Sequence, residues 1–445
     1  MGSAKKPVKT VSLFRNDLEA EFVRRPNRFL IIARAEGREI PCHCPNPGRL
    51  IEFFGFRDCA IPGIGLILEK RAPSGIAAAG PEARAAADNS GLSRKKAAGP
   101  AGAKTGWTVA ALRYRGGIVP FFSARANRAA ETLILPELIP GLREIHPEFT
   151  LGNSRFDFLC IGKRGARHLV EVKACSLIEY GTAMFPDAPS ERALKHLEEL
   201  AALSGQGYQC HVLFVIVHGK PEVFVPNFHT DPLFAAALSK YGHAGPPDPL
   251  FATALSNHGY TAGSVSGGPV AIHASLLRCD PAGNAALAAL SVPVDLSHGK
   301  LAAGDGGNYL IILELPESRG VEIGALGTRA FKRGWYVYAG SARKNLSKRI
   351  SRHLRITGKQ RHWHLDYLRP FAAAVKALPI YSYQNRECDL AAALADLGGK
   401  AVPGFGSSDC RCGSHLYYFR EDPRKSRAFV DMLFRFRHVE GLRRP

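Results

Sequence analysis

The stretch SRFDFLCIGKRGARHLVEVKA, residues 154–174, contains two strand-like runs joined by a short polar turn. Side chains on a strand alternate between faces, so Glu171 and Lys173 share one face and Val172 takes the other. If the two runs pair, Asp157 of the first comes beside Glu171 and Lys173. This patch of two carboxylates and an ammonium group predicts a divalent-metal site. The alternative is a solvent-facing acid–base pair at a strand end.

The charge of the chain indicates the class of partner. Its 445 residues include 59 Lys and Arg against 39 Asp and Glu, a formal net charge of +20. An excess of this size favours a polyanionic partner, most commonly nucleic acid. No stretch predicts a membrane-spanning helix or a secretory signal, so we expect no membrane partner. The ten cysteines are scattered, which favours reduced thiols and a cytoplasmic location.

Composition and periodicity divide the chain into segments. We expect a basic arm at 1–11 and a domain of many short strands at 12–118, of the barrel or sandwich kind. Within that domain, 73–106 is rich in Ala, Gly, Pro and Lys and lacks aromatic residues, which predicts a disordered insertion. The segments predicted to follow are a mixed α/β domain at 119–296, a linker at 297–306 and a second mixed α/β domain at 307–445.

The pattern of Asp157 followed by Glu171-x-Lys173 resembles the PD-(D/E)xK nuclease superfamily. Longer motifs resemble, in the same order, those of the SfsA (sugar fermentation stimulation protein) family. They are HCPNPGRL at 43–50, SRFDFL, VEVKACSL, FPDAPSERALKHLEEL and SVPVDL. The resemblance covers roughly residues 12–296. It implies an α/β multidomain protein with an N-terminal OB-like β-barrel and a PD-(D/E)xK nuclease-like domain, and DNA binding with little sequence preference.

The same resemblance implies catalytic roles for Asp157, Glu171 and Lys173, with the two carboxylates as metal ligands. The metal would be Mg²⁺ or Mn²⁺, since Mg²⁺ is typically held by one or two carboxylates plus phosphate and water. The residues implied around this site are Arg155, Asp187, Arg192 and His196. Of these, we expect the two arginines and the histidine to contact nucleic acid.

The sequence departs from the family pattern at two places. Asn46-Pro47-Gly48 stands where the family tends to have NTG. Glu131, after Asn127-Arg128, lies one position away from the register of a helical Glu in the family, so we assign no fourth metal-site acid. OB barrels commonly bind single strands through aromatic stacking and a basic groove. Residues that could form such a groove, or merely a basic face, are Arg24, Arg25, Arg28, Phe29 and Arg49. We retain Arg28 and Arg49 as nucleic-acid-binding candidates.

A second constellation follows the segment YVYAGSARKNLSKRISRHLR, residues 336–355, which predicts strand, turn and basic helix. Arg349 and His353 fall beside the apolar stripe of that helix, where they can face a cleft. Lys348 and Arg352 fall on the far side, as solvated charges that could contact nucleic acid. Further on, Glu387 sits at the first turn of a predicted helix, where a lone Glu is also an ordinary partner for the helix N-terminus.

Together these residues resemble the GIY-YIG nuclease superfamily, in particular a branch sometimes fused to archaeal endonuclease III. Asn308-Tyr309-Leu310 stands where GIY would be, and Tyr338-Ala339-Gly340 where YIG would be. The motifs HWHLDYL and PGFGSSDCRCGSHLYYF are typical of that branch, and the resemblance covers about residues 307–425. It implies a GIY-YIG-like α/β domain in which the catalytic residues are Tyr309, Tyr338, Arg349, His353 and Glu387, with Glu387 holding one divalent metal.

Cysteines near the C-terminus form a weaker metal-site pattern. Cys410-x-Cys412-x-x-His415, with Cys388 elsewhere, has ligand residue types for zinc, but its spacing is not the familiar C-x₂-C pair. We therefore do not predict zinc, and a loop lining the nuclease cleft is an alternative reading.

These observations predict a cytoplasmic DNA-binding protein with two nuclease-like modules that hydrolyse phosphodiester bonds with Mg²⁺ or Mn²⁺. The DNA could be single- or double-stranded. The alternative is a DNA-binding regulatory or nucleoid-associated protein that affects sugar metabolism genes without cutting. The sequence leaves the catalytic competence of either site and the oligomeric state open.

Overall fold

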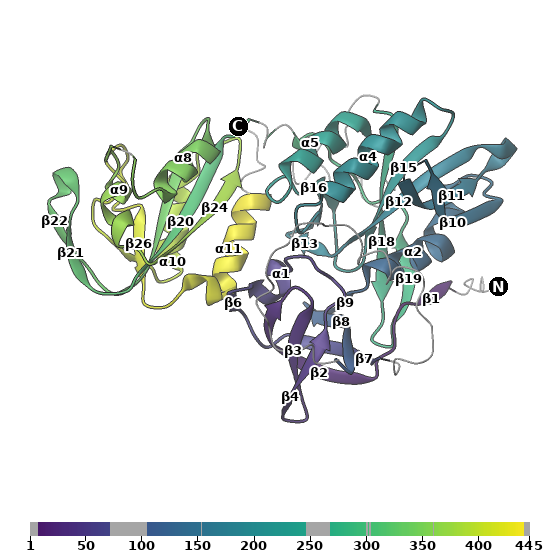
Figure 1. The fold of residues 1–445 in the computed structure, drawn as a ribbon, viewed down its shortest axis with the longest axis horizontal. Helices are drawn as coiled ribbons and strands as arrows, with labels where there is room; N and C mark the ends of the chain where they lie inside the picture. Colours follow the sequence, from purple (N-terminus) through teal and green to yellow (C-terminus); the bar gives the residue numbers. More distant parts are fainter. Residues whose placement is uncertain are drawn as a thin grey trace, which may run out of the picture.

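The computed structural model describes residues 8–71, 105–152, 154–245, 268–299, 301, 304–358 and 360–439. The predicted insertion falls almost entirely on residues outside these ranges. The described chain forms two lobes, with the C-terminal domain on one side and the remainder on the other (Figure 1).

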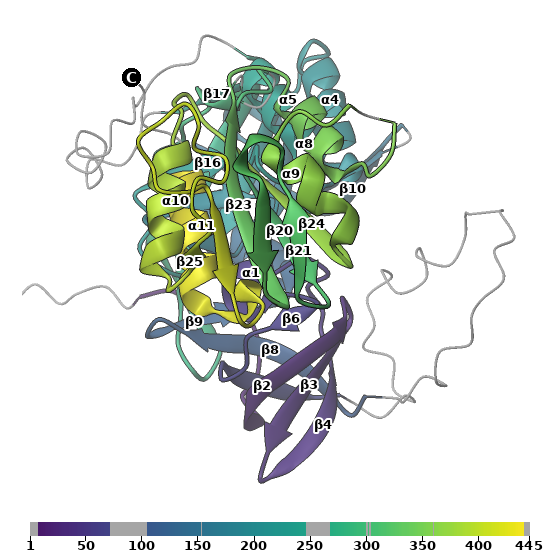
Figure 2. The ribbon, with the colours of Figure 1, turned by 90° about the vertical axis from the view of Figure 1, so that its left-hand side faces the viewer.

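A small barrel forms the base of the larger lobe (Figure 2). Its strands are β2 (Leu18–Asn27), β3 (Leu30–Ala35), β4 (Arg38–His43), β7 (Gly65–Lys70), β8 (Trp107–Tyr114) and β9 (Gly117–Pro120). They follow the order β4-β3-β2-β7-β8-β9, and a parallel pairing of β4 with β8 closes the barrel. The β3–β4 hairpin turns at Glu36 and Gly37, both with positive φ, a conformation that glycine adopts without strain.

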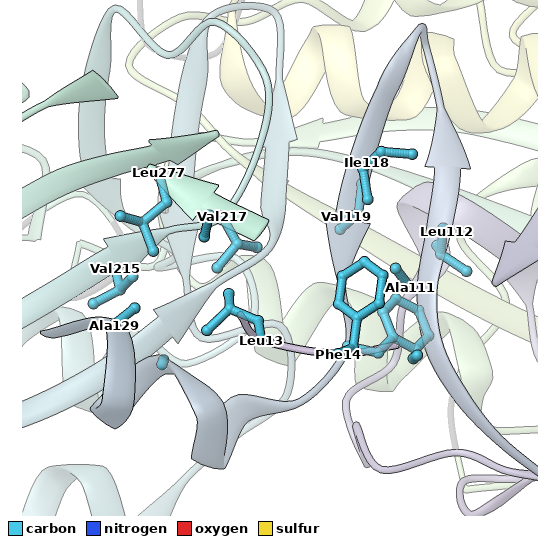
Figure 3. Packing of buried hydrophobic residues seen from close by; sticks show 14 of the residues in the cluster. Leu13, Phe14, Ala111, Leu112, Ile118, Val119, Ala129, Val215, Val217 and Leu277 are labelled. Atoms are coloured by element: carbon cyan, nitrogen blue, oxygen red, sulfur yellow. The ribbon is translucent and has the colours of Figure 1, made fainter. Parts of the chain in front are cut away.

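The predicted basic arm at 1–11 extends too far, because its last residues belong to a strand. Strand β1 (Thr10–Ser12) pairs with β19 (Asn284–Ala289) of the second domain. Leu13 and Phe14, which follow β1, are buried in a hydrophobic cluster shared by barrel and sheet (Figure 3). The side chains that line this cluster from both sides include Ala111, Leu112, Ile118, Val119, Val215, Val217 and Leu277. The barrel and the second domain are therefore one packed body.

The second domain is built on a twisted mixed sheet of order β1-β19-β18-β15-β12-β11-β10, with β17 (Gly242–Ala244) paired to β18. Its other strands are β10 (Glu144–Leu151), β11 (Ser154–Ile161), β12 (Arg167–Cys175), β15 (Gln209–Ile216) and β18 (Val270–Cys279). Strand β15 runs parallel between β12 and β18, which explains its nearly continuous apolar sequence. Helix α4 (Glu191–Ser204) is capped at its N-terminus by Ser190, whose side chain accepts a hydrogen bond from the Ala193 amide.

Smaller elements surround this sheet. They are α2 (Ser123–Ala129), the π-helix η2 (Ala130–Ile134), α3 (Leu135–Leu138), the 3₁₀ turn η3 (Lys163–Gly165), β13 (Leu177–Glu179), β14 (Thr182–Phe185), β16 (Val223–Pro226) and α5 (Pro232–Tyr241). The described part of the predicted linker at 297–306 packs against the second domain. His298 is buried and lies 3.3 Å from Asp295 in an ion-pair arrangement, and Leu301 packs against Val223 and Phe228.

The C-terminal domain is a sheet of order β24-β20-β23-β26-β25 with helices on both faces. Its elements are β20 (Gly307–Leu315), β23 (Gly334–Ala342), β24 (Ala374–Tyr381), β25 (Lys400–Ala401), β26 (Leu416–Phe419), α8 (Leu346–Leu354), α9 (His364–Leu368), α10 (Glu387–Asp396) and α11 (Arg427–His438), with a β21 (Arg319–Glu322) and β22 (Thr328–Phe331) hairpin and the turns η5 (Gly324–Leu326), η6 (Arg369–Phe371) and η7 (Pro423–Lys425). Alternation assigns the faces: Leu310 and Ile312 pack toward α10 and α11, and Tyr309 and Ile311 toward α8 and α9.

Helix α11 joins the two lobes (Figure 1). Its apolar residues share one cluster with Phe56, Leu177 and Met184 of the larger lobe, near α1 (Ile51–Phe54), β5 (Gly55–Phe56) and β6 (Cys59–Ala60). Polar contacts surround this cluster: Arg424 donates to Asp58 at 2.6 Å, and Tyr180 donates to the Asp431 carbonyl at 2.9 Å. A shared core of this kind fixes the lobes relative to each other.

Candidate functional site

The first candidate site lies in a cavity of about 790 Å³ between the barrel and the second domain. Antiparallel pairing of Phe158 with Val170 brings Asp157, one residue before, opposite Glu171, one residue after. Lys173 follows two residues later on the same face of β12, and all three predicted residues line the cavity. The structure thus brings together the patch that alternation predicts.

Asp157 is fixed by two hydrogen bonds. Its Oδ2 accepts from the Val172 amide at 2.7 Å, and its Oδ1 accepts from Asn127 Nδ2 at 2.8 Å. Burial and the nearby Glu171 charge raise the pKa of Asp157, although Lys173 and the two donors oppose this shift. A positive charge placed between the carboxylates would relieve the cost of keeping both ionised.

Glu171 is almost fully buried and has one unused acceptor. Its Oε1 meets Lys173 Nζ and lies 2.5 Å from His196 Nδ1. Its Oε2 is buried and has no hydrogen-bond partner among the described residues. Burial acts to raise the pKa of Glu171, but the hydrogen bond from His196 and the charge of Lys173 outweigh it and lower the pKa. The donor set, with a buried carboxylate oxygen free to coordinate, fits a divalent cation.

Basic residues stand around these carboxylates. Arg28, Arg155 and Arg192 line the cavity with exposed side chains, and Arg155 is 3.5 Å from Glu148. Arg49 is also exposed but lies outside the lining of the cavity. His196, predicted to contact nucleic acid, is absent from the cavity lining: its side chain is buried against Glu171, which favours a role in orienting that carboxylate.

Asp187 closes the cavity where the sequence departs from the NTG pattern. A Cβ on Gly48 would lie 1.6 Å from Asp187 Oδ2, so only glycine lets the two segments approach this closely. The Asp187 Oδ2 is buried without a hydrogen-bond partner in the described chain, and burial raises its pKa. Asn46 keeps the turn in place, because its Oδ1 accepts from the Gly48 amide at 2.9 Å.

Glu131, four residues after Asn127, lies in the π-helix η2. A π-helix inserts an extra residue into a helical turn and often marks a functional segment. Glu131 and Asp157 line a separate hollow of about 280 Å³ together with Glu148. Asp157 thus lines both hollows, whereas Glu131 lines only the smaller one and not the main cavity.

The second candidate site is a smaller cavity of about 190 Å³ in the C-terminal domain. The predicted Tyr309, Tyr338, Arg349 and Glu387 all line it. His353 lies behind Tyr309 and is fully buried, with its Nε2 3.1 Å from the tyrosine hydroxyl. Burial raises the pKa of both tyrosines, which remain neutral at physiological pH.

Glu387 is held by two partners that the sequence did not identify. Ser341 Oγ donates to Glu387 Oε2 at 2.6 Å, and His415 Nδ1 lies 2.8 Å from Oε1. Arg349 Nη1 is 3.4 Å from the Ser341 carbonyl, and its guanidinium stacks over Trp363. Ser341 directly follows the Tyr-Ala-Gly motif, and this adjacency is the signal that could have identified it.

Arg352 was expected to be a solvated charge, and this is wrong. It donates to both carboxylate oxygens of buried Asp366, at 3.2 and 3.0 Å, and its guanidinium lies over the Trp363 ring. Asp366 also accepts from the His362 and Trp363 amides, so it organises the HWHLD segment. Lys348 is exposed, as predicted.

Three family models match the chain. The SfsA N-terminal OB domain matches residues 23–70, the sugar fermentation stimulation protein RE domain matches 124–247, and a domain of unknown function, DUF123, matches 308–437. These matches confirm the predicted architecture of an OB-like barrel, an SfsA domain and a GIY-YIG-like C-terminal domain. No helix in the described ranges combines the length and the apolar composition needed to cross a membrane.

Relatives match the N-terminal part of the chain. The sugar fermentation stimulation protein homolog of Pyrobaculum neutrophilum is 33% identical over 230 residues, which cover 52% of this chain and 84% of that protein. The homolog of Clostridium botulinum is 34% identical over 229 residues, 51% and 85% of the two chains. A solved structure of Pyrococcus furiosus SfsA in complex with Ca²⁺ is 24% identical, with a TM-score of 0.44, covering 64% of this chain and 99% of that one. By its identity to the two homologs and its coverage of them, the chain belongs to the sugar fermentation stimulation protein family, with a DUF123 domain added after the family's two domains.

Proposed function

We propose that this protein binds DNA and hydrolyses phosphodiester bonds at the first cavity with Mg²⁺ or Mn²⁺. One observation carries the proposal: Glu171, Asp157 and Lys173 line one cavity, and Glu171 has a buried carboxylate oxygen without a hydrogen-bond partner among the described residues. Three arginines line the same cavity. Buried polar atoms are normally hydrogen-bonded, so this unused oxygen at the cavity wall is available to coordinate a bound cation.

Asp157 and Glu171 would hold the cation, which when bound can activate water and neutralise charge on the phosphate. The protein supplies the rest. His196 and Asn127 orient the two carboxylates, and Lys173 is placed to orient a nucleophile or exchange a proton with it. Arg28, Arg155 and Arg192 would bind the DNA backbone, since guanidinium groups pair well with phosphates.

An OB barrel on the other wall of the cavity supports DNA as the substrate. OB barrels bind nucleic-acid strands through a basic groove and exposed aromatic rings. Phe29 is such a ring: it is 49% exposed, and the Arg28 guanidinium lies 4.7 Å from its centroid. The ten free cysteines suit a reducing compartment, and we place the protein in the cytoplasm.

A different role is favoured for the second cavity. Both oxygens of Glu387 already accept hydrogen bonds, from Ser341 and His415, so this carboxylate has less coordination capacity than Glu171. The first motif has Asn308 in place of glycine, and Asn308 is buried with its amide bonded to Ser382 and Gln384. We propose that the second cavity contributes DNA binding, with cleavage there as the alternative.

The test is cleavage of labelled single-stranded, duplex and branched DNA with Mg²⁺ or Mn²⁺. Wild type is compared with Glu171→Gln, Glu387→Gln and the double variant. Glu317→Gln is the control, because Glu317 is exposed and lies on neither cavity. We expect Glu171→Gln to lower the rate by about 10²–10³, the scale for losing one stabilising group in an active site, and Glu387→Gln to weaken DNA binding.

Other outcomes are equally informative. Cleavage lost only with Glu387→Gln would move the active site to the C-terminal domain. Intact DNA binding without cleavage by wild type would refute the enzymatic proposal and favour a regulatory DNA-binding protein that affects sugar metabolism genes. Affinity measured against salt concentration tests the backbone contacts, because each phosphate neutralised releases counterions.

A further inference from the structure

Four metal-ligating side chains meet beside the second cavity. Cys388 lies in the first turn of α10, Cys410 and Cys412 in the loop before β26, and His415 just before that strand. One ligand atom from each residue lies within 4.8 Å of the others. Cys388 is exposed, the other two cysteines are half-buried and His415 is 2% exposed, so an ion could reach the cluster from solvent.

Two nitrogen–sulfur spacings are close to those of a tetrahedral site. His415 Nε2 is 3.4 Å from Cys410 Sγ and 3.9 Å from Cys388 Sγ. With a Zn–S bond of about 2.3 Å and a Zn–N bond of about 2.0–2.1 Å, tetrahedral angles place sulfur and nitrogen about 3.6 Å apart. Three thiolates and an imidazole form a soft donor set, which favours Zn²⁺ over Mg²⁺ or Mn²⁺.

The histidine is oriented as a metal ligand requires. Its Nδ1 lies 2.8 Å from Glu387 Oε1, so a proton on Nδ1 leaves Nε2 free to coordinate toward the sulfurs. Its backbone is fixed as well: its amide donates to the Phe405 carbonyl at 2.8 Å, and its carbonyl accepts from the Ala339 amide at 2.9 Å. A carboxylate, a histidine and a metal in this order recur in zinc proteins.

We propose that Cys388, Cys410, Cys412 and His415 bind one structural zinc ion. This differs from the expectation from sequence, which named the same four residues but did not predict zinc because the Cys-x-Cys spacing is not the familiar C-x₂-C pair. The proposal goes beyond DNA binding or cleavage and does not rest on either.

The ion would stabilise a wall of the second cavity. The loop between β25 and β26 contributes Gly406, Ser408 and Asp409 to that wall, and it returns to the sheet through His415. A Cβ on Gly406 would lie 2.7 Å from the Tyr338 ring, so the loop packs directly on a predicted catalytic tyrosine. Zinc would tie this loop to α10, the helix that carries Glu387, and thereby fix the distance between the loop and that carboxylate.

The primary experiment is metal analysis of the full-length protein, purified under reducing conditions and dialysed against metal-free buffer. We expect about one zinc per chain by elemental mass spectrometry. Replacing zinc with Co²⁺ should give the intense visible bands of a tetrahedral site and a thiolate-to-cobalt band in the near ultraviolet. This second readout uses the wild type alone, so it holds even where a variant does not fold.

Variants then assign the ligands. Cys410→Ser and Cys388→Ser should each lose the zinc or lower its affinity in a chelator competition by more than about 100-fold. Cys279→Ser is the matched control, because Cys279 is a partly exposed free cysteine in another domain, and it should keep full zinc content. Glu387→Gln should keep the ion but bind it about 10–100-fold more weakly, as expected for a residue that orients a ligand.

The proposal is overturned if reduced wild type contains less than about a tenth of a zinc per chain and gives no cobalt–thiolate band. A mass 2 Da lower than that of the fully reduced chain, located to a pair of these cysteines, would overturn it in favour of a disulfide. None of these readouts involves DNA, so a failure of the zinc site is distinguishable from a failure of the proposed nuclease activity.

Discussion

Replacing Gly340 with alanine tests how the second cavity is built. Gly340 pairs with Tyr309 across β23 and β20 and is buried. A Cβ at this position would lie 2.4 Å from both Cζ and Oη of the Tyr309 ring. Carbon atoms in contact need about 3.5 Å, so the ring must move by roughly 1 Å. That movement would break the 3.1 Å hydrogen bond between Tyr309 and His353.

The expected cost follows from three contributions. Forcing extra volume into a packed core costs about 1–3 kcal/mol. Losing the buried hydrogen bond to His353 costs about 1 kcal/mol more. Restricting the unfolded chain by exchanging glycine for alanine recovers about 0.4–1 kcal/mol. The free energy of unfolding of the C-terminal domain should therefore fall by about 1–3.6 kcal/mol.

Tryptophan fluorescence during urea denaturation is a suitable assay. Trp335 and Trp363 lie in the C-terminal domain, and a Trp107→Phe background removes the remaining tryptophan, which lies in the barrel. Gly320→Ala is the matched control, because it is an exposed strand glycine of the same domain whose added Cβ would meet Thr328 at 3.5 Å, an ordinary contact. This control should be neutral or stabilising by about 0.5 kcal/mol.

Equal unfolding free energies for the two alanine variants would refute the account of the close glycine–tyrosine contact. A large loss of stability together with unchanged DNA binding by the C-terminal domain would refute the link between the position of Tyr309 and the function of the cavity. It would show that the position of Tyr309 matters for folding and not for the cavity.

Three further predictions concern the first cavity. The pKa of Glu171 is lowered from its ordinary value of 4.5, so its ionised form stabilises the fold at pH values above 4.5. The difference in unfolding free energy between wild type and Glu171→Gln, measured by urea titration, should therefore shrink as the pH falls below 4.5. The raised pKa of Asp187 has the opposite sign, so Asp187→Asn should raise the melting temperature at pH 7 and have little effect at pH 3; a lower melting temperature at pH 7 would contradict this. Arg192→Ala should reduce by about 1 the slope of log affinity for DNA against log salt concentration, and an unchanged slope would exclude Arg192 from backbone contact.

Local periodicity placed the residues of the first candidate site on one face, and the family resemblance supplied the architecture around them. Alternation in 154–174 places Asp157, Glu171 and Lys173 on one face because a strand has a period of two, and the observed register agrees. Helix α4 and the buried strand β15 follow equally from their apolar patterns. The motifs around Tyr309 and Tyr338 likewise identified the wall of the second cavity.

Partners that reach across the fold were not predictable in this way. His196 faces Glu171 because of how α4 packs on the sheet, and Cys388 joins the distant Cys-x-Cys pair because α10 packs against β26. Strand β1 was missed because three residues give too short a pattern to identify pairing with a strand more than 270 residues away. The π-helix at Glu131 was not predicted, because the periodicity used to recognise a helix assumes 3.6 residues per turn.

The packing of α11 between the lobes has a geometric consequence for the two cavities. Two sites on a flexible tether search independently, whereas two sites on one rigid body keep a constant separation. The cluster shared by α11, Phe56, Leu177 and Met184 leaves the cavities no freedom to adjust their spacing. If both cavities bind DNA as proposed, a strand must be long enough to span this fixed separation in order to occupy both, and a shorter strand would occupy only one.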